Sequence, residues 1–173
     1  MRHSAWDYQN SGYYFITINT KNREESFGVI MENTMHLSNI GEIADEELNQ
    51  TVRLRSYVAI DRYVIMPDHV HMILILHEQC IKGGGVARYA ATITSRVNPY
   101  FSSISPKSSS VSSIIRSYKS AVTKRCHENG HNHFAWQSRF YDHIIRDEEE
   151  LYNVRKYVEQ NVMRWGMKQL QPL

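Results

Sequence analysis

Two histidines separated by one residue lie at the start of an apolar segment of the chain. His69 and His71 are followed by the run 72–76, in which every residue is apolar. Residues i and i+2 of a β-strand point to the same face of a sheet, so the two imidazoles are expected side by side. Neutral imidazole is a common ligand of divalent metal ions. The spacing therefore predicts half of a metal site. The alternative is a pair of hydrogen-bonded histidines at a solvated strand edge.

A second group of polar side chains recurs at steps of four residues near the C-terminal end. Asn153, Tyr157 and Asn161 are spaced so that they share one face of a helix predicted over 147–164. A tyrosine hydroxyl can act as a covalent nucleophile when a nearby metal polarises its target. An amide oxygen suits a hard, oxygen-preferring cation. Spacing alone does not single out Tyr157, because the chain has 11 tyrosines.

The elements that must position these residues follow from the hydrophobic pattern. β-Branched and aromatic runs mark strands, and apolar residues at helical spacing mark helices. Besides the last helix, the pattern predicts strands over 13–20, 57–66, 69–76 and 134–146, and helices over 37–55 and 111–128. Mixed strands and helices with a central hairpin favour an α+β fold, an antiparallel sheet with helices packed on one face. The expected architecture is a ferredoxin-like α/β sandwich rather than a doubly wound parallel sheet.

Composition limits the class of protein. The 173 residues suffice for a single domain with a full core, and 42% hydrophobic with 22% charged residues is typical of globular proteins. The glycine- and serine-rich segment 81–110 is predicted to be a flexible insertion, with some helix around 86–95. The formal net charge of +2 does not indicate a nucleic-acid binder, so local clusters must carry that argument. With two cysteines (Cys80 and Cys126), no membrane-spanning run and no signal peptide, we expect a cytoplasmic protein.

Two motifs taken together resemble a known enzyme family. The segment 66–71, Met-Pro-Asp-His-Val-His, and the segment 157–161, Tyr-Val-Glu-Gln-Asn, resemble the single-tyrosine HUH transposases, which cut and rejoin single-stranded DNA. The segments 115–120 and 136–146 are similar to the branch called REP-associated tyrosine transposases. This resemblance runs from the first predicted strand to the last helix. One departure is Val162, which stands where this branch often has proline and allows the helix to continue.

The resemblance implies a site and a reaction. His69, His71 and Asn161 would hold Mg²⁺ or Mn²⁺, and Tyr157 would attack the scissile phosphate. The implied product is a covalent 5′-phosphotyrosine with a free 3′-hydroxyl, and another 3′-hydroxyl can reverse the reaction. The implied partner is single-stranded DNA that carries a hairpin. The wider family includes homodimers and monomers, so a homodimer stays open.

Basic side chains on the helix 111–128 give a candidate DNA surface. A positive surface attracts phosphates, and an exposed aromatic ring can stack on a base. The predicted DNA-binding residues are Arg116, Tyr118 (as the stacking ring), Lys119, Lys124, Arg125 and Arg139. The alternative for a basic helix is a solvated face without a ligand.

Three other functions were weighed. A non-catalytic nucleic-acid-binding module on the same scaffold is the main competitor, and it predicts binding that is indifferent to metal and to Tyr157. A zinc site built from Cys126, His127, His131 and His133 lacks the paired-ligand spacing of structural zinc sites. A metallohydrolase would need a further histidine or carboxylate cluster near the pair in the sequence, and Asp68 is expected to point to the opposite strand face from His69.

Overall fold

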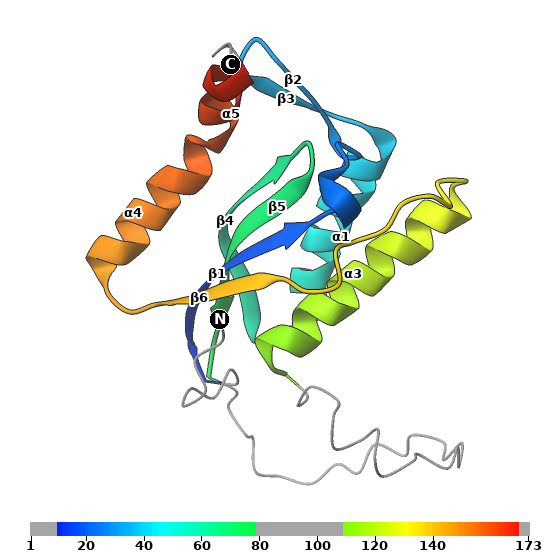
Figure 1. Cartoon of the computed structure of the whole chain (residues 1–173). Coiled ribbons are helices and arrows are strands. Elements are labelled where there is room, and N and C mark those ends of the chain that lie inside the picture. The colour runs from blue at the N-terminus through cyan, green and yellow to red at the C-terminus, as the bar shows by residue number, and fades with distance from the viewer. Residues whose placement is uncertain (1–9, 79–108, 170–173) are drawn as a thin grey trace, which may run out of the picture.

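The computed structural model describes residues 10–78 and 109–169 and contains a four-stranded sheet in the order β4-β5-β1-β6 (Figure 1). Every neighbouring pair in this sheet is antiparallel. The strands are β1 Gly12–Asn19, β4 Val58–Met66, β5 His69–Leu76 and β6 Tyr141–Ile145. Helix α1 (Asn39–Arg53) connects β1 to β4, and α3 (Val111–Glu128) precedes β6. The order strand-helix-strand-strand-helix-strand with this pairing is ferredoxin-like, so the expected α+β fold is confirmed.

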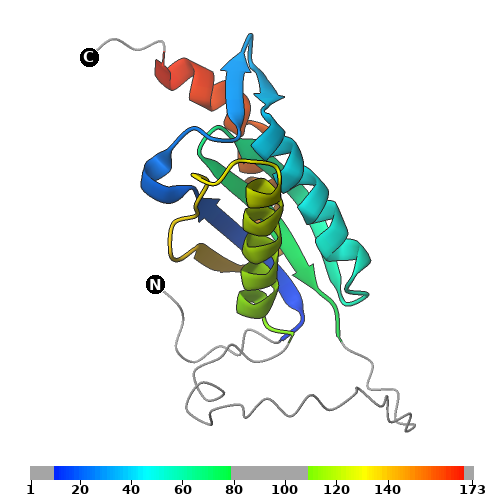
Figure 2. The ribbon, with the colours of Figure 1, turned by 90° about the vertical axis from the view of Figure 1, so that its right-hand side faces the viewer.

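Helices α1 and α3 cover one face of the sheet, as Figure 2 shows. The alternation in β1 decides this, because Tyr14, Ile16 and Ile18 are fully buried while the residues between them are only half-buried. Each helix begins at a serine N-cap, since Ser38 accepts a hydrogen bond from the Gly41 amide and Ser110 accepts one from the Ser113 amide. The main core lies between these helices and the sheet.

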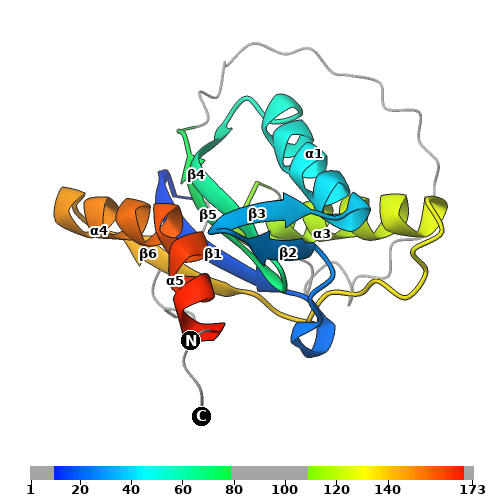
Figure 3. The same cartoon turned by 90° about the horizontal axis from the view of Figure 1, so that it is seen from above.

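The opposite face of the sheet carries helix α4, Glu148–Glu159 (Figure 3). A smaller core joins them, formed by Ile73, Ile145, Leu151 and Val158. The side chain of Asp147 caps α4, and the acidic residues 148–150 in its first turn complement the helix dipole. The two helices of the ferredoxin-like unit thus share one face as expected, and the C-terminal helix adds a layer on the other face.

The prediction of one continuous helix over 147–164 is wrong. Helix α4 ends at Glu159, Gln160 is its C-cap, and α5 (Asn161–Gln169) begins in a new direction. The bend carries α5 to a hairpin of β2 (Gly28–Met31) and β3 (Thr34–Leu37), which the sequence did not predict. No proline is needed, because packing against this hairpin decides the direction of α5.

The other boundaries follow the prediction closely, with one exception. The predicted strand 134–146 is too long, since β6 forms only its end, and the segment before β6 meets the end of β1 through an isolated bridge between Thr20 and Trp136. Phe134 and Trp136 pack against Phe27, so this segment is held by side-chain packing and a few backbone hydrogen bonds rather than as a continuous strand. The predicted insertion 81–110, its helix around 86–95 and Cys80 lie outside the described residues, apart from residues 109 and 110. None of the described helices is long and apolar enough to span a membrane.

Candidate active site

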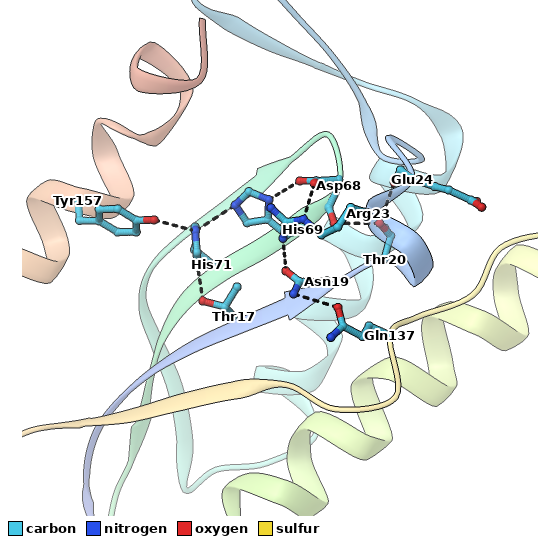
Figure 4. A network of polar contacts seen from close by, with 10 residues as sticks. All are labelled: Thr17, Asn19, Thr20, Arg23, Glu24, Asp68, His69, His71, Gln137 and Tyr157. Carbon is cyan, nitrogen blue, oxygen red and sulfur yellow. Dashed lines mark hydrogen bonds and ion pairs between the residues drawn. The ribbon is translucent and has the colours of Figure 1, made fainter. Parts of the chain in front are cut away.

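The two histidines of β5 project to the same face of the sheet, as their spacing predicted. They lie opposite β1, with His69 paired to Asn19 and His71 paired to Thr17. Their Nε2 atoms are 3.0 Å apart, and both side chains are buried. Figure 4 shows the two rings turned toward each other above β1. Two imidazole nitrogens therefore converge on one point.

The Nδ1 atom of each histidine contacts a neighbouring side chain that fixes the ring. His69 Nδ1 lies 2.5 Å from a carboxylate oxygen of Asp68, and His71 Nδ1 lies 2.8 Å from the Thr17 hydroxyl (Figure 4). When Nδ1–H donates to such a partner, the Nε2 lone pair is left available to a metal. The expectation that Asp68 points away from His69 is wrong. Asp68 lies in the turn between β4 and β5, where strand alternation does not apply, and its second oxygen pairs with Arg23 at 2.8 Å.

His71 is neutral in the folded chain. Burial is the largest of the causes that lower the pKa of His71 to about 3, and the neighbouring His69 and Arg23 act in the same direction. The neutral imidazole is the form that binds metal ions. The electrostatics of the site therefore favour ligation by His71 at neutral pH.

Tyr157 on α4 points its hydroxyl at the histidine pair. Its oxygen lies 3.3 Å from Nε2 of His71, and the two rings are 5.2 Å apart. Phe15 of β1 holds both rings, because it stacks on His71 at 5.2 Å and meets Tyr157 edge-on at 5.8 Å. A single chain thus brings the predicted nucleophile to the predicted metal ligands. Sequence reasoning missed Phe15, although its place on the Thr17 side of β1 follows from strand alternation.

Asn161 is the first residue of α5 and is buried. Four residues before it, Tyr157 contacts His71, and four residues after it, the Trp165 ring lies 5.8 Å from the His69 ring. The start of α5 therefore passes over the histidine pair. Within residues 10–78 and 109–169 no group of three or more His, Cys, Asp or Glu could hold a metal ion, so a metal held by His69 and His71 would take its remaining ligands from other groups or from solvent.

A hollow of about 600 Å³, called here the tyrosine pocket, opens beside the nucleophile. Its walls include Phe15 and Tyr157, together with Arg146, Asp147, Glu149, Glu150, Asn153 and Val154. His143 is engaged at its edge, since its Nε2 lies 2.5 Å from Glu150. This hydrogen bond, with a second from the Arg146 amide, lowers the pKa of Glu150. His143 therefore links β6 to the first turn of α4.

A larger hollow of about 870 Å³, called here the α3 cleft, lies between α3 and the segment 137–142. Arg116, Lys119 and Arg139 line it, so three of the predicted DNA-binding residues do gather at one surface. Lys119 also donates to the carbonyl of Gln137 at 2.6 Å, and burial lowers its pKa. The cleft is also lined by Asn19, which is paired with His69 in the sheet, and by Tyr141, which is paired with Thr17.

Comparison with known proteins gives a relative and a fold. No protein-family model matches the chain. An uncharacterized protein of Haemophilus influenzae (strain Rd) is 31% identical over 170 residues, which cover 98% of this chain and 91% of that protein. The two proteins belong to one family.

The solved structures similar to this chain include a REP-associated tyrosine transposase bound to a REP hairpin. It aligns with a TM-score of 0.60 at 20% identity, over 96% of this chain and 75% of that chain. This likeness shows that the present chain has the fold of that transposase. A putative transposase from Deinococcus radiodurans aligns with a TM-score of 0.44 at 13% identity, over 92% of this chain and 96% of that chain.

The remaining predicted DNA-binding residues lie outside the α3 cleft. Tyr118 is 1% exposed and donates its hydroxyl to the Ala44 carbonyl at 3.1 Å. Its position on α3 faces α1 and the core, so the prediction that Tyr118 stacks on a base is wrong. Arg125 binds Glu46 and Glu47 of α1 and does not line the α3 cleft. Lys124 is exposed and lies 3.7 Å from Glu128 on the next turn.

Proposed function

We propose that this chain is a metal-dependent single-stranded DNA endonuclease and strand transferase of the single-tyrosine HUH transposase kind. One observation carries the proposal: the Tyr157 hydroxyl lies 3.3 Å from His71 Nε2, which is itself 3.0 Å from His69 Nε2. A nucleophile beside two convergent imidazoles is suited to metal-assisted phosphoryl transfer. The fold shared with a REP-associated tyrosine transposase supports the same reaction class.

The donor set fits a Mg²⁺ or Mn²⁺ ion. His69 and His71 offer Nε2 lone pairs, because Asp68 and Thr17 engage the Nδ1 atoms. Asn161 offers an amide oxygen, the kind of ligand that hard cations prefer. When bound, the ion would neutralise negative charge that develops on the phosphate oxygens. With only one neutral oxygen ligand and two imidazoles, the site would bind the ion weakly and exchange it.

The chemistry of the chain itself is a transesterification. The Tyr157 oxygen forms a bond to the phosphorus, the bond from phosphorus to the 3′-oxygen breaks, and the 3′-oxygen leaves as a hydroxyl. The phenolic proton is balanced by the proton gained by that hydroxyl, and the 5′ end stays attached as a phosphotyrosine. Attack by a different 3′-hydroxyl reverses the step and joins two strands without another energy source. Phe15 would hold the Tyr157 ring in line through its edge-on contact.

The DNA would bind along the α3 cleft and continue to Tyr157. Arg116, Lys119 and Arg139 give this cleft three cationic side chains. The substrate proposed is single-stranded DNA that carries a hairpin, by analogy with the REP hairpin bound by the transposase of similar fold. Affinity for it should fall steeply as the salt concentration rises.

The test is the detection of a covalent protein–DNA adduct on a denaturing gel. Labelled single-stranded hairpin oligonucleotides are incubated with Mn²⁺ or with EDTA, using wild type, Tyr157→Phe and Tyr152→Phe. Tyr152 is the matched control, since it lies on α4 but is 64% exposed and lines neither hollow. We expect an adduct that needs Mn²⁺, survives Tyr152→Phe and is lost in Tyr157→Phe.

Two outcomes contradict the proposal in different ways. An adduct that persists in Tyr157→Phe places the nucleophile on another residue. Tight binding of the hairpins without any adduct, unaffected by EDTA, favours a non-catalytic nucleic-acid-binding module on the same fold.

A further inference from the structure

Tyr141 is an exposed aromatic residue at the rim of the active-site face. It is the first residue of β6 and is 52% exposed. In the antiparallel register it lies opposite Thr17, the residue whose hydroxyl contacts His71. Directly paired residues of neighbouring strands share a face of the sheet. The Tyr141 side chain therefore lies on the same face as the histidine pair, at the edge of the sheet.

The Tyr141 ring connects the α3 cleft with the tyrosine pocket. Tyr141 lines the α3 cleft, whereas Phe15 and Tyr157 line the tyrosine pocket. Phe15 contacts both tyrosines, at 6.5 Å from the Tyr141 ring and 5.8 Å from the Tyr157 ring. A strand that passes from the basic cleft to the nucleophile must therefore cross Tyr141.

We propose that the exposed face of Tyr141 is a stacking subsite for one unpaired nucleobase near the scissile phosphate. This inference rests on the proposed function and names a part of its substrate site. Proteins that bind single strands combine a positively charged groove with aromatic rings on which bases stack. The α3 cleft supplies the charge through Arg116, Lys119 and Arg139, and Tyr141 supplies the ring.

The subsite would position the strand more than it would select its sequence. Every base has a flat face, so stacking tolerates any of the four bases. The Tyr141 ring meets Phe15 at an interplanar angle of 69°, and Tyr141 stays 52% exposed, so part of the ring is accessible to a base. Because Phe15 links it to Tyr157, the stacked base would lie within a few nucleotides of the attacked phosphate.

The test uses fluorescence of 2-aminopurine, a base analogue whose emission falls when it stacks. The analogue replaces each unpaired position in turn in a panel of single-stranded hairpin oligonucleotides. All proteins carry Tyr157→Phe to block cleavage, and they have Tyr141 intact, Tyr141→Phe, Tyr141→Ala or the control Tyr152→Ala. We expect quenching at one position, retained with Tyr141→Phe and Tyr152→Ala and lost with Tyr141→Ala. Affinity should fall about tenfold or more with Tyr141→Ala alone.

A second measurement separates stacking from a general loss of structure. An abasic nucleotide at the quenched position should weaken binding of the intact protein and remove the difference from Tyr141→Ala. If Tyr141→Ala binds and quenches like Tyr152→Ala, the subsite proposal is overturned, even where wild type forms the adduct. Quenching that depends on Tyr141, without an adduct in any protein, supports the subsite and contradicts the nuclease.

Discussion

At the scale of single residues, the buried carboxylate of Asp68 has a defined task. One oxygen contacts His69 Nδ1 at 2.5 Å, and the other pairs with Arg23 at 2.8 Å. The first contact fixes the tautomer and the orientation of the ring, and the second fixes the carboxylate. Partners of this kind orient metal-binding histidines and raise their basicity.

Replacing Asp68 with asparagine should therefore weaken metal binding while keeping the size of the side chain. We expect the Mn²⁺ affinity to fall about 10- to 100-fold, the usual effect of removing such a partner. Titration calorimetry with Mn²⁺ measures this without DNA. Asp45→Asn is the control, because Asp45 lies on α1 and accepts a hydrogen bond from Tyr63, remote from the histidines in its contacts. Equal affinities for the two variants would contradict the role of Asp68.

The spacing of residues in the sequence predicts the histidine pair, but it does not predict the residues that orient the two imidazole rings. His69 and His71 share a face because strand periodicity is strict, and that could be read from the sequence. Asp68 could not be assigned, because its contact depends on the geometry of a turn rather than on alternation. Tyr118 shows the reverse error: its position in a basic helix suggested a DNA contact, but helix packing buries it.

At the scale of elements, helix α3 carries two arginines whose surroundings differ. Arg116 is exposed and lines the α3 cleft, whereas Arg125 is held by Glu46 and Glu47 at 2.6 and 3.0 Å. Both are basic residues of one helix, so sequence composition assigns them the same role. Their surroundings distinguish them, since Arg125 fastens α3 to α1.

Arg116→Ala and Arg125→Ala should consequently have different effects. Loss of a phosphate contact in Arg116→Ala should weaken binding of hairpin DNA and lower the slope of its salt dependence by about one. Arg125→Ala should leave that slope unchanged and reduce the free energy of unfolding by less than about 1 kcal/mol, as for other exposed ion pairs. Fluorescence anisotropy across a range of salt concentrations gives the slopes, and urea unfolding gives the stabilities. A reversed pattern would mean that the DNA follows the α1 side of α3.

The break between the C-terminal helices α4 and α5 could not be predicted from the sequence pattern. The heptad-like spacing over 147–164 is compatible with one helix, and no proline or glycine marks a break near Gln160. The chain bends there because α5 packs on the β2–β3 hairpin, and Trp165 packs near His69. Such contacts join segments far apart in the sequence, so local periodicity cannot reveal them.

At the scale of the whole molecule, one chain assembles every proposed catalytic group. The histidines lie on β5 in the sheet, and Tyr157 on α4 reaches His71 across the face opposite α1 and α3 (Figures 3 and 4). The ion pair of Arg155 with Asp61, at 2.7 Å, ties α4 to β4 of the same chain. The fold therefore brings Tyr157 to the histidine pair of its own chain.

Mixing two inactive variants tests this arrangement. Neither His71→Ala nor Tyr157→Phe should form an adduct alone, because each lacks one half of the site. If the site is built within one chain, a mixture of the two also stays inactive, since no chain contains both halves. A mixture of wild type with Tyr157→Phe is the control, and its adduct should follow the amount of wild type. Adduct formation by the two inactive variants together would instead show that α4 reaches the histidines of a second copy, and sedimentation of that mixture would then reveal a dimer.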